Sequence, residues 1–226
     1  MTIIRSVVSR VRPLLRTMYR RYVLPPPPNL IGDRDVEYSW ISANMPEGPG
    51  KALDFGAGKG NMGLVAAFRG FETTAIDLLP LERPYAHDAL SLVQGDILKS
   101  SYAAESFDLI INCSVIEHVG LVGRYDIDVE LRDGDLIAMK RLLDLLRPGG
   151  RMLLTIPVGV DAVFFPRHRI YGEQRLPQLL NGWRITRSEF WMKDDTNRWV
   201  RVERSAATGR QAVAHCYSLG LFVLEK

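Results

Sequence analysis

One short glycine-rich segment constrains the fold more than any other feature of this chain. A short apolar strand is predicted from residue 51 to Asp54, and three glycines follow it before an apolar pattern with helical spacing begins. The glycines let the backbone approach a ligand closely at the amino end of that helix, where free amide groups point outward. The segment therefore predicts a strand, a tight turn and a helix that together bind a nucleotide-like cofactor.

The charges around these glycines discriminate between the cofactors that such a loop can bind. ATP is disfavoured, because Lys59 is followed by glycine instead of the GK[ST] ending that coordinates magnesium. A nicotinamide cofactor is a stronger rival, since residues 58–63 satisfy the GxGxxG pattern and Asp77 follows at a suitable distance. However, Asp54 would repel the pyrophosphate of a dinucleotide and attract the ammonium and sulfonium groups of S-adenosylmethionine. The charges favour S-adenosylmethionine.

An ordered series of motifs resembles the class I S-adenosylmethionine-dependent methyltransferases. Their first motif is matched by DFGAGKG, their second strand by TTAIDLL, and their later motifs by QGDIL, FDLIINCSVIEHV and LLRPGGRMLLTIP. The resemblance implies that Asp77 binds the ribose hydroxyls and that Asp96 binds the adenine amino group. It also implies a doubly wound, Rossmann-like α/β fold with a seven-stranded sheet whose last strand is antiparallel. The expected cofactor-binding residues are Asp54, Gly56, Ala57, Gly58, Gly60, Asp77, Leu78, Asp96, Ile97 and Ser114.

Two further segments resemble a subset of methyltransferase-like proteins grouped as domain of unknown function 268. The segments are EHVGLVGRYD, which begins at residue 117, and IPVGVDAVFFPRHRIYG, which ends at residue 172. The second follows the fifth predicted strand, where loops beyond the carboxyl edge of a parallel sheet form binding crevices. We therefore expect Arg124, Tyr125, Arg169 and Tyr171 to contact the acceptor, with a solvated basic loop as the alternative for the last segment.

The chemistry of methyl transfer to a hydroxyl group requires a base that removes the proton of the acceptor. His118 is the first candidate and His168 the second, and a packed structural histidine is the alternative for His118. Glu117 is assigned a structural role, because residues 114–117 form the S-x-x-E pattern of a helix capping box. The expected reaction is O-methylation of a small-molecule, glycan or lipid-linked acceptor. An NAD(P)-dependent oxidoreductase and a catalytically inactive scaffold that binds S-adenosylmethionine stay open as alternatives.

Composition and charge disfavour several other classes of protein. The chain has 226 residues, 46% hydrophobic and 24% charged, which fits one large globular domain. Its two cysteines have no zinc-binding spacing, and residues 126–135 are expected to form a solvated acidic loop, so we expect no metal. Nucleic acid is not an expected partner, because the chain is mildly acidic beyond its first 24 residues.

The amino-terminal segment is predicted to be a separate element. Residues 1–24 have the pattern of a basic amphipathic helix, and four prolines end it, so the expected boundaries are 1–28 and 29–226. Three interpretations stay open: contact with an anionic membrane surface, packing on the chain's own domain, and a cleaved presequence. The expected location is cytoplasmic, at the inner face of a membrane under the first interpretation.

The remaining elements follow from apolar periodicity and proline content. Prolines between residues 78 and 89 exclude a full helix there, and the polar stretch 193–210 is expected to be a loop or excursion near the acceptor side. The other predictions are a crossover helix at 129–147, a strand at 151–156, a short helix at 173–181, and strands at 183–191 and 215–224.

Overall fold

A computed structural model describes residues 15, 18, 32–83, 85–123, 125, 129–213 and 216–226 of the chain. The chain divides into two compact units, Met1–Gly32 and Asp33–Lys226. The amphipathic helix predicted for residues 1–24 lies outside the described residues, apart from Leu15 and Met18, which are helical and exposed. No helix within the described residues is long and apolar enough to cross a membrane.

The second unit is built on one eight-stranded sheet with the strand order β3-β2-β1-β4-β5-β10-β8-β9. The first five strands in this order are parallel, and the last three pair in antiparallel fashion. This arrangement confirms the doubly wound fold and the antiparallel last strand. The strands are β1 (Gly50–Phe55), β2 (Phe71–Asp77), β3 (Leu90–Gln94), β4 (Phe107–Cys113), β5 (Leu146–Val158), β8 (Arg184–Lys193), β9 (Trp199–Val202) and β10 (Ser218–Glu225).

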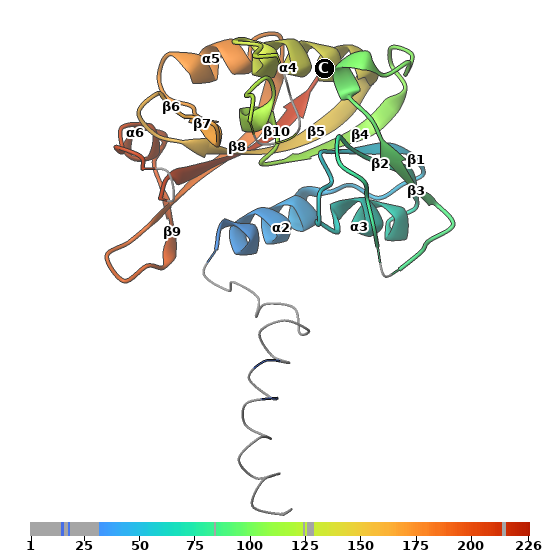
Figure 1. Cartoon of the computed structure of the whole chain (residues 1–226), viewed down its shortest axis with the longest axis horizontal. Helices are drawn as coiled ribbons and strands as arrows, with labels where there is room; N and C mark the ends of the chain where they lie inside the picture. The colour runs from blue at the N-terminus through green and yellow to red at the C-terminus, as the bar shows by residue number, and fades with distance from the viewer. Residues whose placement is uncertain are drawn as a thin grey trace, which may run out of the picture. The chain divides into compact units, whose positions relative to one another are not determined.

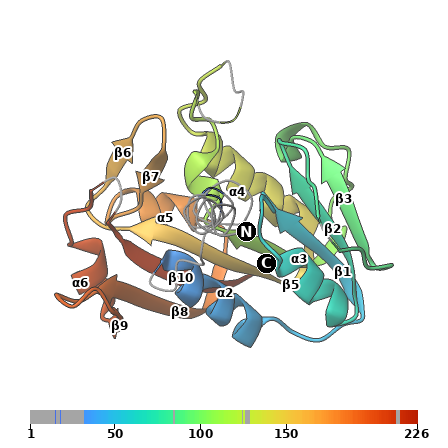
Figure 2. The same cartoon turned by 60° about the horizontal axis from the view of Figure 1, so that its bottom comes forward.

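Helices cover both faces of this sheet, as a doubly wound fold requires (Figure 1). On one face, α2 (Asp33–Asn44) and α3 (Met62–Phe68) lie side by side (Figure 2). On the other face lie α4 (Gly134–Leu145) and α5 (Arg175–Leu179). Buried apolar side chains of α4 and α5 belong to one apolar cluster, and those of α2 and α3 belong to another. The shorter elements are α6 (Arg204–Thr208), the 3-10 helices η1 (Ile97–Lys99) and η2 (Ile116–His118), and a hairpin of β6 (Ala162–Phe164) and β7 (His168–Ile170).

The central strands β1 and β4 end at the same edge of the sheet, where two loops begin. The last four residues of β1 and the run 109–112 of β4 are buried, which is typical of parallel strands covered on both faces. Phe55 pairs with Asn112, so the two strands end at the same level. Consequently the glycine-rich loop after β1 and the segment after β4 emerge next to each other.

The segment 193–210 differs from the prediction of a loop. It contains β9, which pairs with the end of β8 and raises the number of strands from seven to eight, and the short helix α6. The pattern WVRV is too short to predict a strand without its neighbour. Other bounds differ by a few residues: the crossover helix begins at Gly134, β5 extends on both sides of 151–156, and the last strand begins at Ser218. The described part of 78–89 contains no helix, as predicted.

Helix α2 is an element that the sequence analysis did not predict. Asp33 and Asp35 lie in its first turn, where negative charge is favourable beside the helix dipole. Its buried face consists of Glu37, Trp40 and Ile41, which have helical spacing. Because a glutamate occupies the centre of this face, the apolar pattern by itself is weak.

Candidate active site

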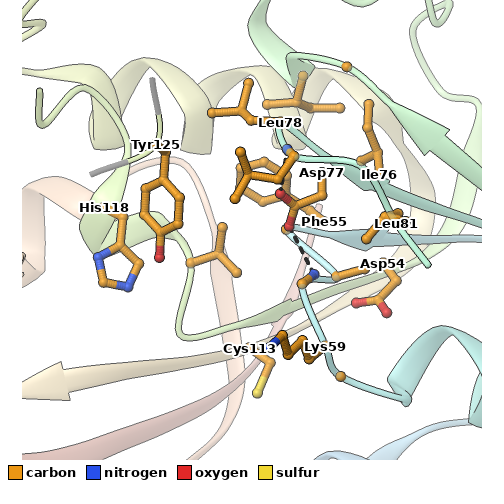
Figure 3. Close-up of a pocket in the computed structure, with 18 of the residues that line it drawn as sticks. Asp54, Phe55, Lys59, Ile76, Asp77, Leu78, Leu81, Cys113, His118 and Tyr125 are labelled. Atoms are coloured by element: carbon orange, nitrogen blue, oxygen red, sulfur yellow. Dashed lines mark hydrogen bonds between the residues drawn. The ribbon is translucent and has the colours of Figure 1, made fainter. Parts of the chain in front are cut away.

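An open pocket of about 1470 Å³ lies at the carboxyl ends of β1, β2 and β4. Ligand sites for one small molecule are usually about 300–1,000 Å³, so this pocket has room for a cofactor and a second molecule. The pocket is lined by all ten residues that the sequence analysis assigns to cofactor binding, and by His118 and Tyr125. Figure 3 shows His118 and Tyr125 together on one side of the pocket and Asp54 on the other.

The glycine-rich loop adopts a conformation that depends on glycine at two positions. Gly56 and Gly58 have φ values of 66° and 46°, in the left-handed region that disfavours side chains. A Cβ atom at Gly56 would lie 2.3 Å from a methyl carbon of Val115, so this position also has no space for a side chain. The amide of Gly58 donates a hydrogen bond to Asp77 Oδ2 at 2.8 Å, which fixes the loop against the end of β2 (Figure 3).

Asp54 lies deeper in the pocket than the sequence analysis expects. Its side chain accepts a hydrogen bond from the amide of Gly63 at 2.8 Å, and only 3% of the residue is exposed. Burial raises the pKa of this carboxyl group to about 6, against the opposing effects of the Gly63 amide and of the Arg83 charge. Asp54 is therefore ionised at neutral pH and presents a buried negative charge to the pocket.

Asp77 and Asp96 each stabilise a loop while they line the pocket. Asp77 accepts hydrogen bonds from Gly58 and, at 2.9 Å, from the amide of Leu79. Asp96 accepts one from the amide of Leu98 at 2.9 Å and so begins η1. A carboxylate has about four acceptor sites, so these bonds leave capacity for a ligand hydroxyl or amino group.

A buried glutamate connects the unpredicted helix α2 to the pocket. Glu37 is fully buried, pairs with Arg34, and accepts hydrogen bonds from Ser114 and, at 2.7 Å, from Thr155. Arg34 and Tyr38 of the same helix line the pocket, and so do Lys59 and Arg83. The acidic first turn and the helical spacing of Trp40 and Ile41 are the signals that point to this helix in the sequence.

The capping box predicted for residues 114–117 is not formed. The hydroxyl group of Ser114 donates to Glu37, and η2 begins after Val115 without a side-chain cap. Ser114 has a φ value of 51°, which directs its side chain away from the geometry that a capping box needs. Glu117 is therefore buried for a reason other than the one predicted.

His118 forms the wall of the pocket opposite Asp54. Its Nδ1 atom lies within hydrogen-bonding distance of the backbone oxygen of Arg167, so Nδ1 carries the proton of the neutral ring. Its Nε2 atom lies 3.7 Å from Glu117 Oε1. The imidazole also contacts the ring of Tyr125, with 5.6 Å between ring centroids.

His168, the second candidate base, does not line this pocket. Only 6% of the residue is exposed, and its ring packs against Phe164 and Tyr217 at centroid distances of 5.7 and 5.2 Å. It lies behind His118, with 6.3 Å between the two ring centroids. Its position on β7 directs it into the protein, which the sequence around residue 168 does not reveal.

Arg169 and Tyr171, which the sequence analysis expects to contact the acceptor, lie in a buried polar network. Neither lines the pocket. Arg169 is buried and donates to the backbone oxygens of Val119, at 2.7 Å, and Arg132, at 3.1 Å. Tyr171 is fully buried and donates to Asp135 Oδ2 at 3.1 Å. Arg124 lies outside the described residues.

Asp135 is the centre of this network, although it belongs to the stretch expected to be a solvated acidic loop. It is fully buried at the start of α4, where it pairs with Arg175 and lies 3.8 Å from Arg169 Nε. Asp126 and Asp128 of the same stretch lie outside the described residues. The network ties the segment that carries His118 to β7.

Comparison with known protein families identifies the chain. One family profile matches residues 75–215, which is more than half of the sequence. The chain belongs to this family, described as Caenorhabditis protein of unknown function, DUF268. A comparison with curated proteins finds no match.

Solved structures similar to this DUF268 protein share the methyltransferase fold. The 1,6-didemethyltoxoflavin-N1-methyltransferase of Burkholderia thailandensis, solved with S-adenosylhomocysteine, is 19% identical, with a TM-score of 0.55 over 85% of this chain and 76% of that one. A TehB-like S-adenosylmethionine-dependent methyltransferase of Corynebacterium glutamicum is 20% identical, with a TM-score of 0.52 over 84% and 86%. At these identities the similarity establishes the fold alone.

Proposed function

We propose that this DUF268 protein is an S-adenosylmethionine-dependent methyltransferase that acts on an oxygen acceptor. The observation that carries the proposal is the pair of carboxylates, Asp54 and Asp77, that flank the glycine-rich loop inside the pocket. A dinucleotide would place its pyrophosphate against the charge of Asp54, whereas the amino-acid end of S-adenosylmethionine carries an ammonium group. The pocket therefore favours the methyl donor over NAD.

Residues that line the pocket can be assigned to each part of this cofactor. Asp54 would bind the ammonium group, and Asp77 would accept hydrogen bonds from the ribose hydroxyls. Asp96 would accept one from the adenine amino group, and Leu78 and Ile97 would contact the ring. When bound, the cofactor supplies an electrophilic methyl group on a sulfonium.

The acceptor occupies the wall opposite Asp54. Tyr125, Val129 and Leu131 also line the pocket, and Val129 and Leu131 are exposed apolar residues that can contact a carbon skeleton. His118 takes the hydroxyl proton at Nε2, because its Nδ1 proton is directed to the Arg167 carbonyl. This chemistry suits a small-molecule, glycan or lipid-linked hydroxyl group. The contact of residues 1–24 with a membrane and the cytoplasmic location stay predictions from the sequence.

The replacement of His118 tests the proposed reaction. We expect His118→Ala to lower the turnover of methyl-labelled S-adenosylmethionine with hydroxyl acceptors by about 10²–10⁴-fold, because proton removal is lost. Affinity for S-adenosylhomocysteine, measured by calorimetry, should stay within about threefold of wild type, since the contacts of the loop are unchanged.

The matched control is His87→Gln, which replaces a histidine that packs against Phe68 and does not line the pocket, and it should keep full turnover. Full turnover in His118→Ala would contradict the assigned base. Binding of S-adenosylhomocysteine without turnover over a broad acceptor panel in the wild type would favour a scaffold that has no catalytic activity.

A further inference from the structure

Glu117 is a buried carboxyl group for which the structure provides no structural role. Only 3% of the residue is exposed, and its Oε2 atom has no hydrogen-bond partner among the described residues. The capping box that would explain its position is not formed. A buried polar atom without a partner costs free energy, so its presence beside a pocket calls for a functional explanation.

Glu117 lies beside the candidate base. The distance between Glu117 Oε1 and His118 Nε2 is 3.7 Å, which is too long for a hydrogen bond and suits an ion pair. The Nδ1 atom of His118 is directed to the backbone oxygen of Arg167, so a proton taken up by the ring arrives at Nε2. The positive charge formed in this way lies next to the carboxyl group.

The other groups around this pair lie on α2, on β7 and in the segments that contain Tyr125, Tyr171 and Tyr217. Burial is the largest effect and raises the pKa of Glu117 to about 8, and the nearby negative charges of Glu37 and Asp33 act in the same direction. Arg34 opposes them. The remaining neighbours with titratable or charged side chains are Tyr171, Arg169, Tyr217, Tyr125 and His168.

We propose that Glu117 is a positioning residue that sets the basicity of His118, an inference that rests on the proposed methyl transfer. Ionised Glu117 stabilises the imidazolium that forms when Nε2 takes the proton of the acceptor hydroxyl. As the acceptor oxygen forms its bond to the methyl carbon, the carbon–sulfur bond breaks and its electron pair stays on sulfur. The proton taken by Nε2 then leaves to solvent, and neutral Glu117 gives no such stabilisation.

A direct test follows the imidazole of His118 by nitrogen-15 NMR from about pH 5 to about pH 10. We expect a step in the nitrogen-15 chemical shift near pH 8 in the wild type, because the ionisation of Glu117 changes the charge beside Nε2. The step should be absent in Glu117→Gln, which has the shape of the protonated carboxyl group and should fold normally. The His118→Ala variant identifies the resonance.

Two matched variants separate the effect of the Glu117 carboxyl group from the effect of replacing any glutamate. Glu117→Asp keeps a carboxyl group and should keep a step, at a changed pH. Glu72→Gln replaces an exposed glutamate on β2 and should leave the step unchanged. Persistence of the step in Glu117→Gln, or its absence in the wild type, would overturn the proposed pair.

The rate measurement links the pair to the proposed reaction. Wild-type kcat should rise with pH around 8, and Glu117→Gln should lose this rise, with kcat about tenfold lower at alkaline pH and KM unchanged. An identical pH profile in the two proteins would also overturn the role of Glu117. If the wild type shows no methyl transfer and no binding of S-adenosylhomocysteine, the proposed function fails, while the NMR step still decides whether the two residues are coupled.

Discussion

Asp135→Ala should lower the free energy of unfolding by about 3–5 kcal/mol, because it leaves the buried guanidinium of Arg169 without its carboxylate. Asp135 is fully buried and joins Arg169, Arg175 and the hydroxyl group of Tyr171. Removing one partner of a buried ion pair lowers the free energy of unfolding by more than the pair itself contributes, because the remaining charge is buried without compensation. Denaturant unfolding followed by circular dichroism measures this loss.

The neighbouring Asp133 provides a matched control. It pairs with the same Arg175 at 3.0 Å, but 55% of its side chain is exposed. Asp133→Ala should therefore cost less than about 1 kcal/mol. An equal decrease in the free energy of unfolding in the two variants would show that burial does not determine how much each ion pair contributes to stability.

The second large effect concerns the cofactor. Asp54→Asn should weaken binding of S-adenosylhomocysteine about 10–100-fold at neutral pH, because a charge-assisted hydrogen bond to the ammonium group contributes about 1.5–3 kcal/mol. Asparagine has nearly the same shape and can still accept the hydrogen bond of Gly63, so the loop should keep its conformation. Calorimetric titration measures the change, with Asp195→Asn, an exposed residue in the turn after β8, as the control.

The pH dependence of binding provides a second test of Asp54. Burial raises the pKa of its carboxyl group to about 6, so the ionised form that attracts ammonium is lost as the pH falls below 6. Wild-type affinity should then decrease by about tenfold per pH unit. In Asp54→Asn this slope should be absent, and an equal slope in both proteins would contradict the role of the carboxylate.

The sequence correctly brings the residues of the glycine-rich loop together in one pocket because this part of the pocket is local in the chain. The glycine-rich loop, Asp54 and Asp77 belong to a single strand–turn–helix–strand unit, in which spacing along the chain determines which groups meet. The same reasoning fails for His168, whose direction depends on how the hairpin of β6 and β7 folds back. Local spacing contains no information about that packing.

Charged residues in the core explain the other errors. Helix α2 is not predicted because Glu37 occupies its buried face, and Asp135 is assigned to solvent because charge usually marks an exposed loop. In each case partners distant in sequence, Thr155 for the first and Tyr171 for the second, make the burial possible. Sequence periodicity identifies apolar cores and gives no signal for buried polar networks.

The most direct test of the proposed function is calorimetric titration of the full chain with S-adenosylhomocysteine and, in parallel, with NAD. We predict micromolar binding of S-adenosylhomocysteine alone, weakened by Asp77→Ala because the ribose hydroxyls lose their acceptor. Binding of NAD alone would contradict the charge argument for Asp54, the assigned base and the proposed methyl transfer together.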